Sequence, residues 1–242
     1  MNILLTGSEG FIGSHLSYLL KQEHDVIGFD LKNGHDILSS KFPDDIDLVL
    51  HMASMSGVRD SLDKPTEYWK TNVIGTQRLF EHYRDTRIIY ASSSTAHEPW
   101  KNPYAMSKYS MEQLDHNNAV GLRFTTVYGP GAKKDMLIPK ILNNDVSYLN
   151  INHIRDFIHV NDVVNAVEIM MINTFRGVVD VGTGISNKLV DIADYFKIDY
   201  KSVIGDETER LDNTADTSIL NRFGWRAKIN LYNYIEENRN VN

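Results

Sequence analysis

Short apolar runs alternate with amphipathic segments through the first half of the chain, and this alternation predicts an α/β fold. The apolar runs cover residues 3–5, 26–29, 48–50 and 88–91, and a fifth strand is expected within 121–130. Continuous runs of this kind are typical of strands buried on both faces of a parallel sheet. Between them, residues 11–20 and 66–83 and the segment that begins at Tyr104 have helical spacing. Strands that alternate with helices imply a parallel sheet.

The second half of the chain is less regular. We expect short helices over residues 136–142, 190–196 and 220–225, and a longer helix to Met171 that Asn161 or Asp162 caps. Extended segments are expected over 146–151, 155–160 and 178–181. The sequence shows no internal repeat, low-complexity tract or linker. Its length suits one domain with a small appendage.

Composition and charge narrow the classes of function. Acidic residues outnumber basic ones, 32 to 25, for a net charge of −7, so the long-range field opposes nucleic acids and anionic membranes as partners. Cysteine is absent, which excludes disulfides, thiolate metal sites and a cysteine nucleophile, and we expect no metal. The N-terminus lacks the features of a signal peptide, and no apolar run has membrane-spanning length. We therefore expect a cytoplasmic protein.

A glycine-rich turn follows the first apolar run. Gly7, Gly10 and Gly13 stand three positions apart, between a predicted strand and a predicted helix. Such a turn can cradle phosphate, because the backbone approaches a pyrophosphate closely and the helix N-terminus supplies free N–H groups. Asp30 ends the second strand 23 positions after Gly7, near the spacing at which an acidic residue meets the ribose hydroxyls of a dinucleotide. A carboxylate there repels a 2′-phosphate, which favours NAD over NADP.

Each of these features also has an ordinary explanation. The glycines could form an unremarkable strand-to-helix turn, and Asp30 could be a solvated loop residue. The combination of turn, strand, helix and acidic residue favours the dinucleotide site.

Polar residues near the ends of later strands are further candidates. Asp36 and Ile37 follow the second strand, where a carboxylate could reach an adenine amino group or simply be solvated. His51 ends the third strand with no second ligand nearby, so a structural hydrogen-bonding role is favoured over a metal or base role. Ser93 and Ser94 end the fourth strand, where doubly wound sheets bind ligands, although serine is also common in ordinary loops.

The sequence from Tyr104 to Lys108 carries the most distinctive chemistry. In a helix these two residues lie one turn apart on one face. A nearby cation favours the phenolate over the phenol, whose pKa is about 10 when free, and such a pair suits proton transfer. An ordinary surface pair is the alternative. Only ten positions separate Ser94 from Tyr104, so a hydroxyl and the phenol can converge.

With these features in place, the chain resembles the extended short-chain dehydrogenase/reductases, and within them the nucleotide-sugar epimerase/dehydratase group. Five segments carry the resemblance, in order and nearly from end to end. They are residues 6–13, Asn72 with Val73, Gly75 and Thr76, residues 102–108, residues 155–160, and Ala215-Asp216 with Phe223-Gly224-Trp225.

The resemblance implies the architecture. An NAD-binding Rossmann domain, a doubly wound parallel sheet, would comprise residues 1–130, with segments of 150–185 returning to it. Residues 131–242 would mostly form a small, shortened C-terminal substrate-binding lobe. The residues that it implies for NAD binding are Gly7, Gly10, Phe11, Ile12, Gly13, Asp30, Asp36, Ile37, Met52, Ala53, Ser54, Asn72, Tyr104 and Lys108.

The resemblance also implies a reaction. Tyr104 would take the proton of a sugar hydroxyl, at C4, while hydride passes from that carbon to NAD. Lys108 would lower the tyrosine pKa and hold the nicotinamide ribose. Ser93, with Ser94 as second choice, would contact the reacting oxygen. The keto-sugar would then rotate and receive the hydride on its other face, while Arg155 and Arg210 neutralise the diphosphate.

Residues next to the serine cluster favour an epimerase. Related 4,6-dehydratases have an Asp-Glu pair at the places of Ser94 and Thr95, and related decarboxylases have a glutamate at the place of Ser94. Residues 57–61 and 122–136 most resemble the UDP-uronate 4-epimerases, in which a threonine and a basic residue meet the sugar carboxylate. Thr126 and Lys133 occupy those places here, although Lys133 could equally be a solvated lysine. The expected substrate is therefore a UDP-sugar, with a UDP-uronate as one candidate.

Two alternatives stay open, an NAD(P)H-dependent reductase of a nucleotide keto-sugar and a non-catalytic NAD-binding protein of the same fold. The presence of both Tyr104 and Lys108 argues against the second. The chain departs from the family pattern over residues 95–98 and is shorter over 94–104 and 139–155, all beside the expected sugar pocket. Relatives dimerise through the helices that contain Asn72 and begin at Tyr104, so we expect a homodimer.

Overall fold

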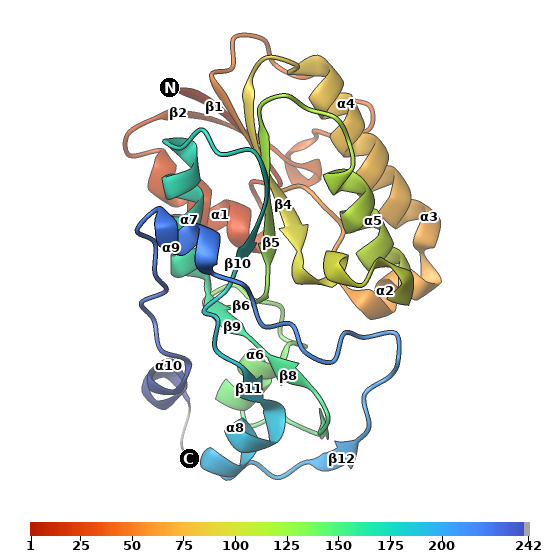
Figure 1. The fold of residues 1–242 in the computed structure, drawn as a ribbon, viewed down its shortest axis with the longest axis vertical. Coiled ribbons are helices and arrows are strands. Elements are labelled where there is room, and N and C mark those ends of the chain that lie inside the picture. The colour runs from red at the N-terminus through yellow and green to blue at the C-terminus, as the bar shows by residue number, and fades with distance from the viewer. Residues whose placement is uncertain (240–242) are drawn as a thin grey trace.

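A six-stranded, wholly parallel sheet forms the upper part of the molecule in Figure 1, a computed structural model that describes residues 1–239. Its strands are β1 (Asn2–Thr6), β2 (Asp25–Phe29), β3 (Leu48–His51), β4 (Arg87–Ser93), β5 (Ala119–Phe124) and β10 (Gly177–Val181). They lie in the order β10-β5-β4-β3-β1-β2. The chain order reverses between β1 and β3, so the sheet is doubly wound and the predicted fold class is confirmed.

Helices cover both faces of this sheet, which explains the continuous apolar runs. On one face, α1 (Phe11–Leu20) and α7 (Val160–Met171) pack in one cluster with Ile3 and Leu5. On the other, Leu4 and Val49 pack in a second cluster with residues of α4 (Gly75–His82) and α5 (Pro103–Glu112). Alternate strand residues point to opposite faces, and here both faces exclude water.

Strand β2 is an edge strand. Only a single 3₁₀ turn, Leu31–Asn33, lies between β2 and β3 among the regular elements. In the common doubly wound order, another strand lies outside the second one and covers its edge. Here no strand within residues 1–239 covers β2, and its residue Ile27 is 42% exposed. The connection between β2 and β3 therefore runs over the surface beside the glycine turn.

The helix predicted over residues 66–83 is present but irregular. It consists of α3 (Pro65–Tyr68), a π-helical segment (Trp69–Ile74) and α4, without a break in helical backbone angles. Asn72 lies in the π-helical segment. Such π turns inside α-helices are frequent at functional sites.

A smaller lobe lies below the sheet in Figure 1 and has its own apolar cluster, which includes Ile138, Phe157 and Ile192. The lobe contains three two-stranded sheets, β6·β9, β7·β12 and β8·β11. Its elements are β6 (Thr126–Tyr128), α6 (Leu137–Leu142), β7 (Tyr148–Asn150), β8 (Ile154–Arg155), β9 (Phe157–His159), β11 (Asn187–Lys188), α8 (Leu189–Tyr195), β12 (Lys201–Val203) and α10 (Leu231–Asn238). Within residues 1–239, we find no helix with both the length and the apolar character needed to cross a membrane.

Three local expectations need correction. The fifth strand is interrupted at Thr125, so that β5 pairs within the main sheet while β6 pairs with β9 in the lobe. The N-cap of helix α7 is His159, two residues before Asn161, because the His159 side chain accepts from Asn161 N (3.1 Å). The short helix α2 (Val58–Asp63) and the helix α10 had no counterpart among the predicted elements.

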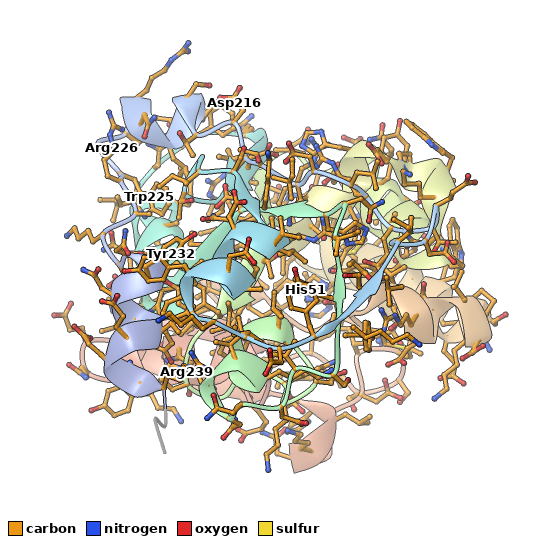
Figure 2. The ribbon with its side chains drawn as sticks, turned by 90° about the horizontal axis from the view of Figure 1, so that it is seen from below. His51, Asp216, Trp225, Arg226, Tyr232 and Arg239 are labelled. Carbon is orange, nitrogen blue, oxygen red and sulfur yellow. The ribbon has the colours of Figure 1, made fainter. Side chains whose placement is uncertain are left out.

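The C-terminal segment runs along the outside of both parts. From Asp216 it passes through α9 (Ser218–Arg222) to Trp225 and then to Tyr232 and Arg239 in or after α10 (Figure 2). The indole N–H of Trp225, a buried residue, donates to the backbone oxygen of Asp162 on α7 (3.3 Å). Both parts of the molecule are therefore held by the same terminal stretch.

Asp156, between β8 and β9, joins the lobe to the sheet. It is completely buried, and its carboxylate accepts from Thr183 N (2.9 Å), Thr183 Oγ1 (2.6 Å), Gly184 N (2.8 Å) and Ala215 N (3.2 Å). Its backbone N–H donates to Asn213 Oδ1 (2.7 Å). A buried carboxylate is tolerated when its lone pairs are satisfied in this way.

We expect Asp156→Asn to lower the free energy of unfolding by about 3 kcal/mol, because an amide is a weaker acceptor and turns an NH₂ group toward N–H donors. Chemical denaturation of both proteins measures this. Asp145→Asn, at an exposed carboxylate, serves as the control. If Asp156→Asn lowers the free energy of unfolding no more than Asp145→Asn does, then the Asp156 carboxylate does not hold the two parts of the molecule together.

Candidate active site

The turn between β1 and α1 leaves no room for side chains. Gly7 has a φ of +69°, and a Cβ on it would lie 2.6 Å from Ala53 N. A Cβ on Gly13 would lie 2.0 Å from Gly7 O. Gly10 is the N-cap of α1, with no side chain bonded to the helix terminus, so the N–H groups of Phe11 and Ile12 open the helix without a side-chain cap. The bare backbone and the helix N-terminus together fit a pyrophosphate.

Asp30 is held beside this turn. Its carboxylate accepts from Glu9 N (3.0 Å) and Lys32 N (2.9 Å), while its own N–H donates to Asn33 Oδ1 (2.9 Å). Each carboxylate oxygen has a further lone pair for a hydroxyl donor. The arrangement fits the ribose role expected of Asp30.

The next two predicted residues differ in their exposure. Asp36 caps its own loop, with its carboxylate accepting from Leu38 N (2.9 Å) and Ser39 Oγ (3.3 Å). The side chain of Ile37 is buried and lies against Gly75. For Ile37, only the backbone would be available to a ligand.

A chain of hydrogen bonds links the loop of Met52, Ala53 and Ser54 to the helix of Asn72. Ala53 N donates to Thr6 Oγ1 (3.2 Å), which contacts His51 Nδ1 (2.7 Å); His51 Nε2 contacts Thr76 Oγ1 (2.9 Å), which donates to the backbone oxygen of Asn72. Because Thr76 gives its proton to Asn72, it must accept from His51, which assigns the proton of His51 to Nε2.

His51 is buried within the body of the molecule (Figure 2). Burial, and then the charge of Lys108, lower the pKa of His51 to about 3. The ring is therefore neutral at physiological pH, and the hydrogen-bonding role expected for it is confirmed.

Asn72 attaches the same loop to α5. Its side chain accepts from Met55 N (2.8 Å) and donates to Met55 O (3.1 Å) and to Ser107 Oγ (2.9 Å). The hydroxyl of Ser107 in turn donates to the backbone oxygen of Tyr104 (2.8 Å). Asn72 thus connects the predicted cofactor loop to the helix that carries Tyr104.

The structure brings Tyr104 and Ser93 together. Helix α5 begins with Pro103, and the side chain of its N-cap Asn102 accepts from Ala105 N (2.8 Å), which places Tyr104 in the first turn. Burial raises the pKa of Tyr104, and a hydrogen bond with the Ser93 hydroxyl opposes that shift. The phenol and the hydroxyl converge at the carboxyl end of β4, as the sequence indicated.

Lys108 is the most deeply buried cation of the site, with 1% of its surface exposed. Its Nζ donates to Ala91 O (2.7 Å) and lies 5.9 Å from the centre of the Tyr104 ring. Burial lowers the pKa of Lys108 to about 7, and the charge of Glu112 opposes this. In this structure the pKa of Tyr104 is raised, so its burial outweighs any effect of the lysine.

Glu112 and Arg123 form a buried pair behind Lys108 that sequence reasoning missed. Arg123 donates to both carboxylate oxygens of Glu112 (2.8 and 2.6 Å), and Ser92 Oγ donates to Oε1 (2.5 Å). The signal for Glu112 was its place four residues after Lys108, on the same helix face. Arg123, from β5, had no local signal.

Besides Ser93, the four residues expected to bind substrate lie at different places around the lobe. Thr126 Oγ1 accepts from Asn213 (3.0 Å), and the exposed Lys133 reaches Ser56 O (3.4 Å). Arg210 donates to the backbone oxygen of Ser94 (2.7 Å), so it reaches the serine turn. Arg155 instead donates to Leu211 O (3.0 Å) and Glu209 (3.4 Å).

A family model described as "NAD dependent epimerase/dehydratase family" matches residues 3–182. The chain belongs to this family. NAD is therefore its cofactor, as predicted from the glycine turn and Asp30. Protein CapI of Staphylococcus aureus is 33% identical over 227 aligned positions, which cover 69% of this chain and 68% of CapI.

A solved structure supports the same placement. UDP-glucuronic acid 4-epimerase from Bacillus cereus, in complex with UDP-glucuronic acid and NAD, superposes with a TM-score of 0.87 at 25% identity, covering 98% of both chains. The UDP-glucose 4-epimerase of Yersinia enterocolitica is 26% identical and aligns over 322 positions, covering 98% of this chain and 96% of the relative. Because this chain has 242 residues, that relative carries segments that this chain lacks.

We expect Gly13→Ala to weaken NAD binding at least about tenfold, because the new methyl group would force α1 away from Gly7. Titration calorimetry with NAD measures this. Gly10→Ala is the matched comparison. Its Cβ would lie 3.1 Å from the nearest atom, so it should weaken NAD binding less than Gly13→Ala does. Wild-type affinity in Gly13→Ala would mean that NAD does not use this turn.

The low pKa of Lys108 predicts a pH-dependent stability. Between pH 7 and 10.5 the unfolded chain keeps a proton that folded Lys108 has lost, so the stability of the wild type should rise with pH relative to Lys108→Met. The slope should be on the order of 1 kcal/mol per pH unit. Denaturation curves at pH 7, 8.5 and 10 test this, with Lys21→Met, at an exposed lysine, as the control. Parallel curves for wild type and Lys108→Met would contradict it.

Proposed function

We propose that this protein is an NAD-dependent nucleotide-sugar epimerase that inverts C4 of a UDP-sugar through a 4-keto intermediate. One observation carries the proposal: the hydroxyls of Ser93 and Tyr104 converge beside the buried Lys108. They do so at the carboxyl ends of parallel strands, the same sheet edge at which the glycine turn lies. Cofactor turn and proton-transfer group thus lie at one edge of the sheet, as hydride chemistry on a sugar requires.

Each side chain of the site has its own role in the proposed reaction. When bound, NAD supplies a reversible hydride acceptor with a positively charged ring. Tyr104 takes the proton of the C4 hydroxyl as that carbon becomes a ketone, holds it, and returns it to the same oxygen when the carbon is reduced from the other face. Ser93 bonds to the reacting oxygen and to the phenol. Lys108, when protonated, provides a nearby positive charge that favours the phenolate.

An epimerase is favoured over a dehydratase by the residues after the strand-end serine. Elimination of water needs an acid and a base beside the sugar, and Ser94 and Thr95 supply neither. The next acidic residue, Glu98, lies 3.6 Å from Lys101 and 3.9 Å from Arg210, atom to atom between charged groups. It therefore lies among the cations of the shortened turn, although it makes no hydrogen bond to either of them.

Two further features of the substrate are proposed from the same residues. The relative of known structure from Bacillus cereus acts on UDP-glucuronic acid, and Thr126 and Lys133 would meet a sugar carboxylate here. Arg210, which reaches the serine turn, and Arg155 would neutralise the diphosphate. A reductase of a keto-sugar differs in one respect, since it would consume NADH in proportion to product.

We also propose a two-part organisation, with the substrate bound between the sheet and the lobe, and a homodimer. The helices that relatives use for pairing expose large apolar side chains here, namely Trp69, Ile74, Met106 and Tyr109. Clustered exposed apolar residues are typical of interaction surfaces. A cytoplasmic location stays a prediction.

We expect Tyr104→Phe to abolish epimerisation while leaving the affinity for NAD within about twofold, because only the acidic hydroxyl is lost. Incubation with UDP-glucuronic acid, UDP-glucose and other nucleotide sugars, followed by separation of the epimers, measures turnover, and calorimetry measures NAD binding. Tyr109→Phe, five residues along the same helix, is the control. Full turnover in Tyr104→Phe would reject the assigned mechanism.

A further inference from the structure

Two arginines from different parts of the molecule converge on one internal carboxylate. Arg59 comes from α2, beside the sheet, and Arg155 from β8 of the lobe. Glu209 lies between them: its Oε1 is 3.7 Å from Arg59 Nη2, and its Oε2 is 3.4 Å from Arg155 Nη2. We propose that Glu209 is an internal competitor of the substrate, whose carboxylate occupies this arginine pair until the diphosphate of a substrate replaces it. The inference rests on the proposed function, because that function supplies the diphosphate.

The contacts of Glu209 are long. Charge-assisted hydrogen bonds between nitrogen and a carboxylate oxygen typically measure about 2.7–2.9 Å. Neither arginine reaches that distance to Glu209, although both make shorter bonds elsewhere. Arg59 Nη1 donates to Tyr148 OH (2.6 Å), and Arg155 Nη1 donates to Ile154 O (2.9 Å). These other bonds fix the two guanidinium groups, and the carboxylate is only loosely held between them.

The neighbouring histidine does not strengthen the hold on Glu209. Arg155 Nη2 donates to His153 Nδ1 (2.9 Å), so that nitrogen carries no proton. Burial first, and then the charge of Arg155, lower the pKa of His153. Its unprotonated Nδ1 lies 3.6 Å from Glu209 Oε2, which places two lone pairs opposite each other. Arg59 and Arg155 thus share the Glu209 carboxylate, while the charges of Asp135 and Asp212 also act on Arg59 and Arg155 respectively. A diphosphate would bring more negative charge between the two guanidinium groups than one carboxylate does.

Glu209 belongs to a segment that can release its side chain without unfolding. Residues 204–212, here called the strap, follow β12 and include no buried residue. The strap is tied to the turn before α5 through its backbone, with Lys101 Nζ donating to Glu207 O (2.9 Å) and Asn102 Nδ2 to Thr208 O (2.8 Å). In Figure 1 it extends from β12 up beside the region of α2 and α5. The side chain of Glu209 can therefore rotate away while these backbone contacts persist.

The position of the strap connects this exchange to the reacting groups. Arg210, the next residue, donates to the backbone oxygen of Ser94, beside the hydroxyl of Ser93. A ligand that replaces the Glu209 carboxylate would therefore lie within reach of Arg59, Arg155 and Arg210. A ligand without phosphate does not replace the carboxylate, so Glu209 weakens the binding of diphosphates and leaves the binding of other ligands unchanged.

Equilibrium binding to the full-length, NAD-loaded protein tests this. We expect Glu209→Gln to bind UDP about five- to tenfold more tightly than the wild type, because the competing charge is gone. Its affinity for uridine, which has no phosphate, should not change. Glu207→Gln is the matched control, since only the backbone oxygen of Glu207 is used. Titration calorimetry at low and high salt measures the affinities of the wild type and of both variants. The gain in UDP affinity of Glu209→Gln should shrink as salt is added.

Several results would overturn the proposal. Equal or weaker UDP binding in Glu209→Gln would mean that the carboxylate positions the arginines, or is irrelevant to the ligand. A gain for uridine as large as for UDP would show a general loosening of the strap. Glu209→Ala provides a second variant, which should share the gain. Absence of UDP binding in every variant would also reject the inference, whereas the proposed hydride chemistry is judged separately, by turnover in Tyr104→Phe.

Discussion

The burial of one ammonium group constrains the whole candidate site. Lys108 is almost fully withdrawn from water, and a cation in that position is costly unless it is hydrogen-bonded and near negative charge. Ala91 O supplies the hydrogen bond and Glu112 the charge. Lys108 and Glu112 lie on α5, and their partners Ala91 and Ser92 lie on β4, so these bonds hold the helix against the strand in one register. That register fixes Tyr104, one turn before Lys108, next to Ser93 at the end of the same strand.

The charged residues that surround Lys108 continue to the edge of the sheet. Arg123 balances Glu112 and also lies 3.9 Å from Asp180 on β10, which contacts His97 (3.0 Å). His97 belongs to the segment after Ser94 in which the chain departs from the family pattern. Its contact with Asp180 explains how a shortened turn stays in place: a polar anchor on the edge strand replaces the chain that is missing. The same network therefore supports both the lysine and the turn that carries the serines.

Sequence reasoning succeeded where the determinants are local. The glycines of the first turn, the apolar runs of the sheet and the one-turn spacing of Tyr104 and Lys108 depend on neighbours within a few residues, and each was found. Arg123 and Glu209 depend on partners 11 and 54 residues away, Glu112 and Arg155, which no local pattern reveals. The π-helical turn around Asn72 also escaped, since the partners of the Asn72 side chain, Met55 and Ser107, lie 17 and 35 residues away and leave no local pattern.

The small lobe shows how a reduced chain can still build a polar site. The relative from Yersinia enterocolitica carries segments that this chain lacks, and here the segment that contacts the serine turn is a strap without a buried residue. Its order comes from hydrogen bonds to Lys101 and Asn102 and from charges at Glu209 and Arg210, not from an apolar core of its own. Polar contacts of this kind exchange more readily than packed side chains. Rearrangement around a charged ligand would therefore be confined to the strap and leave the sheet undisturbed.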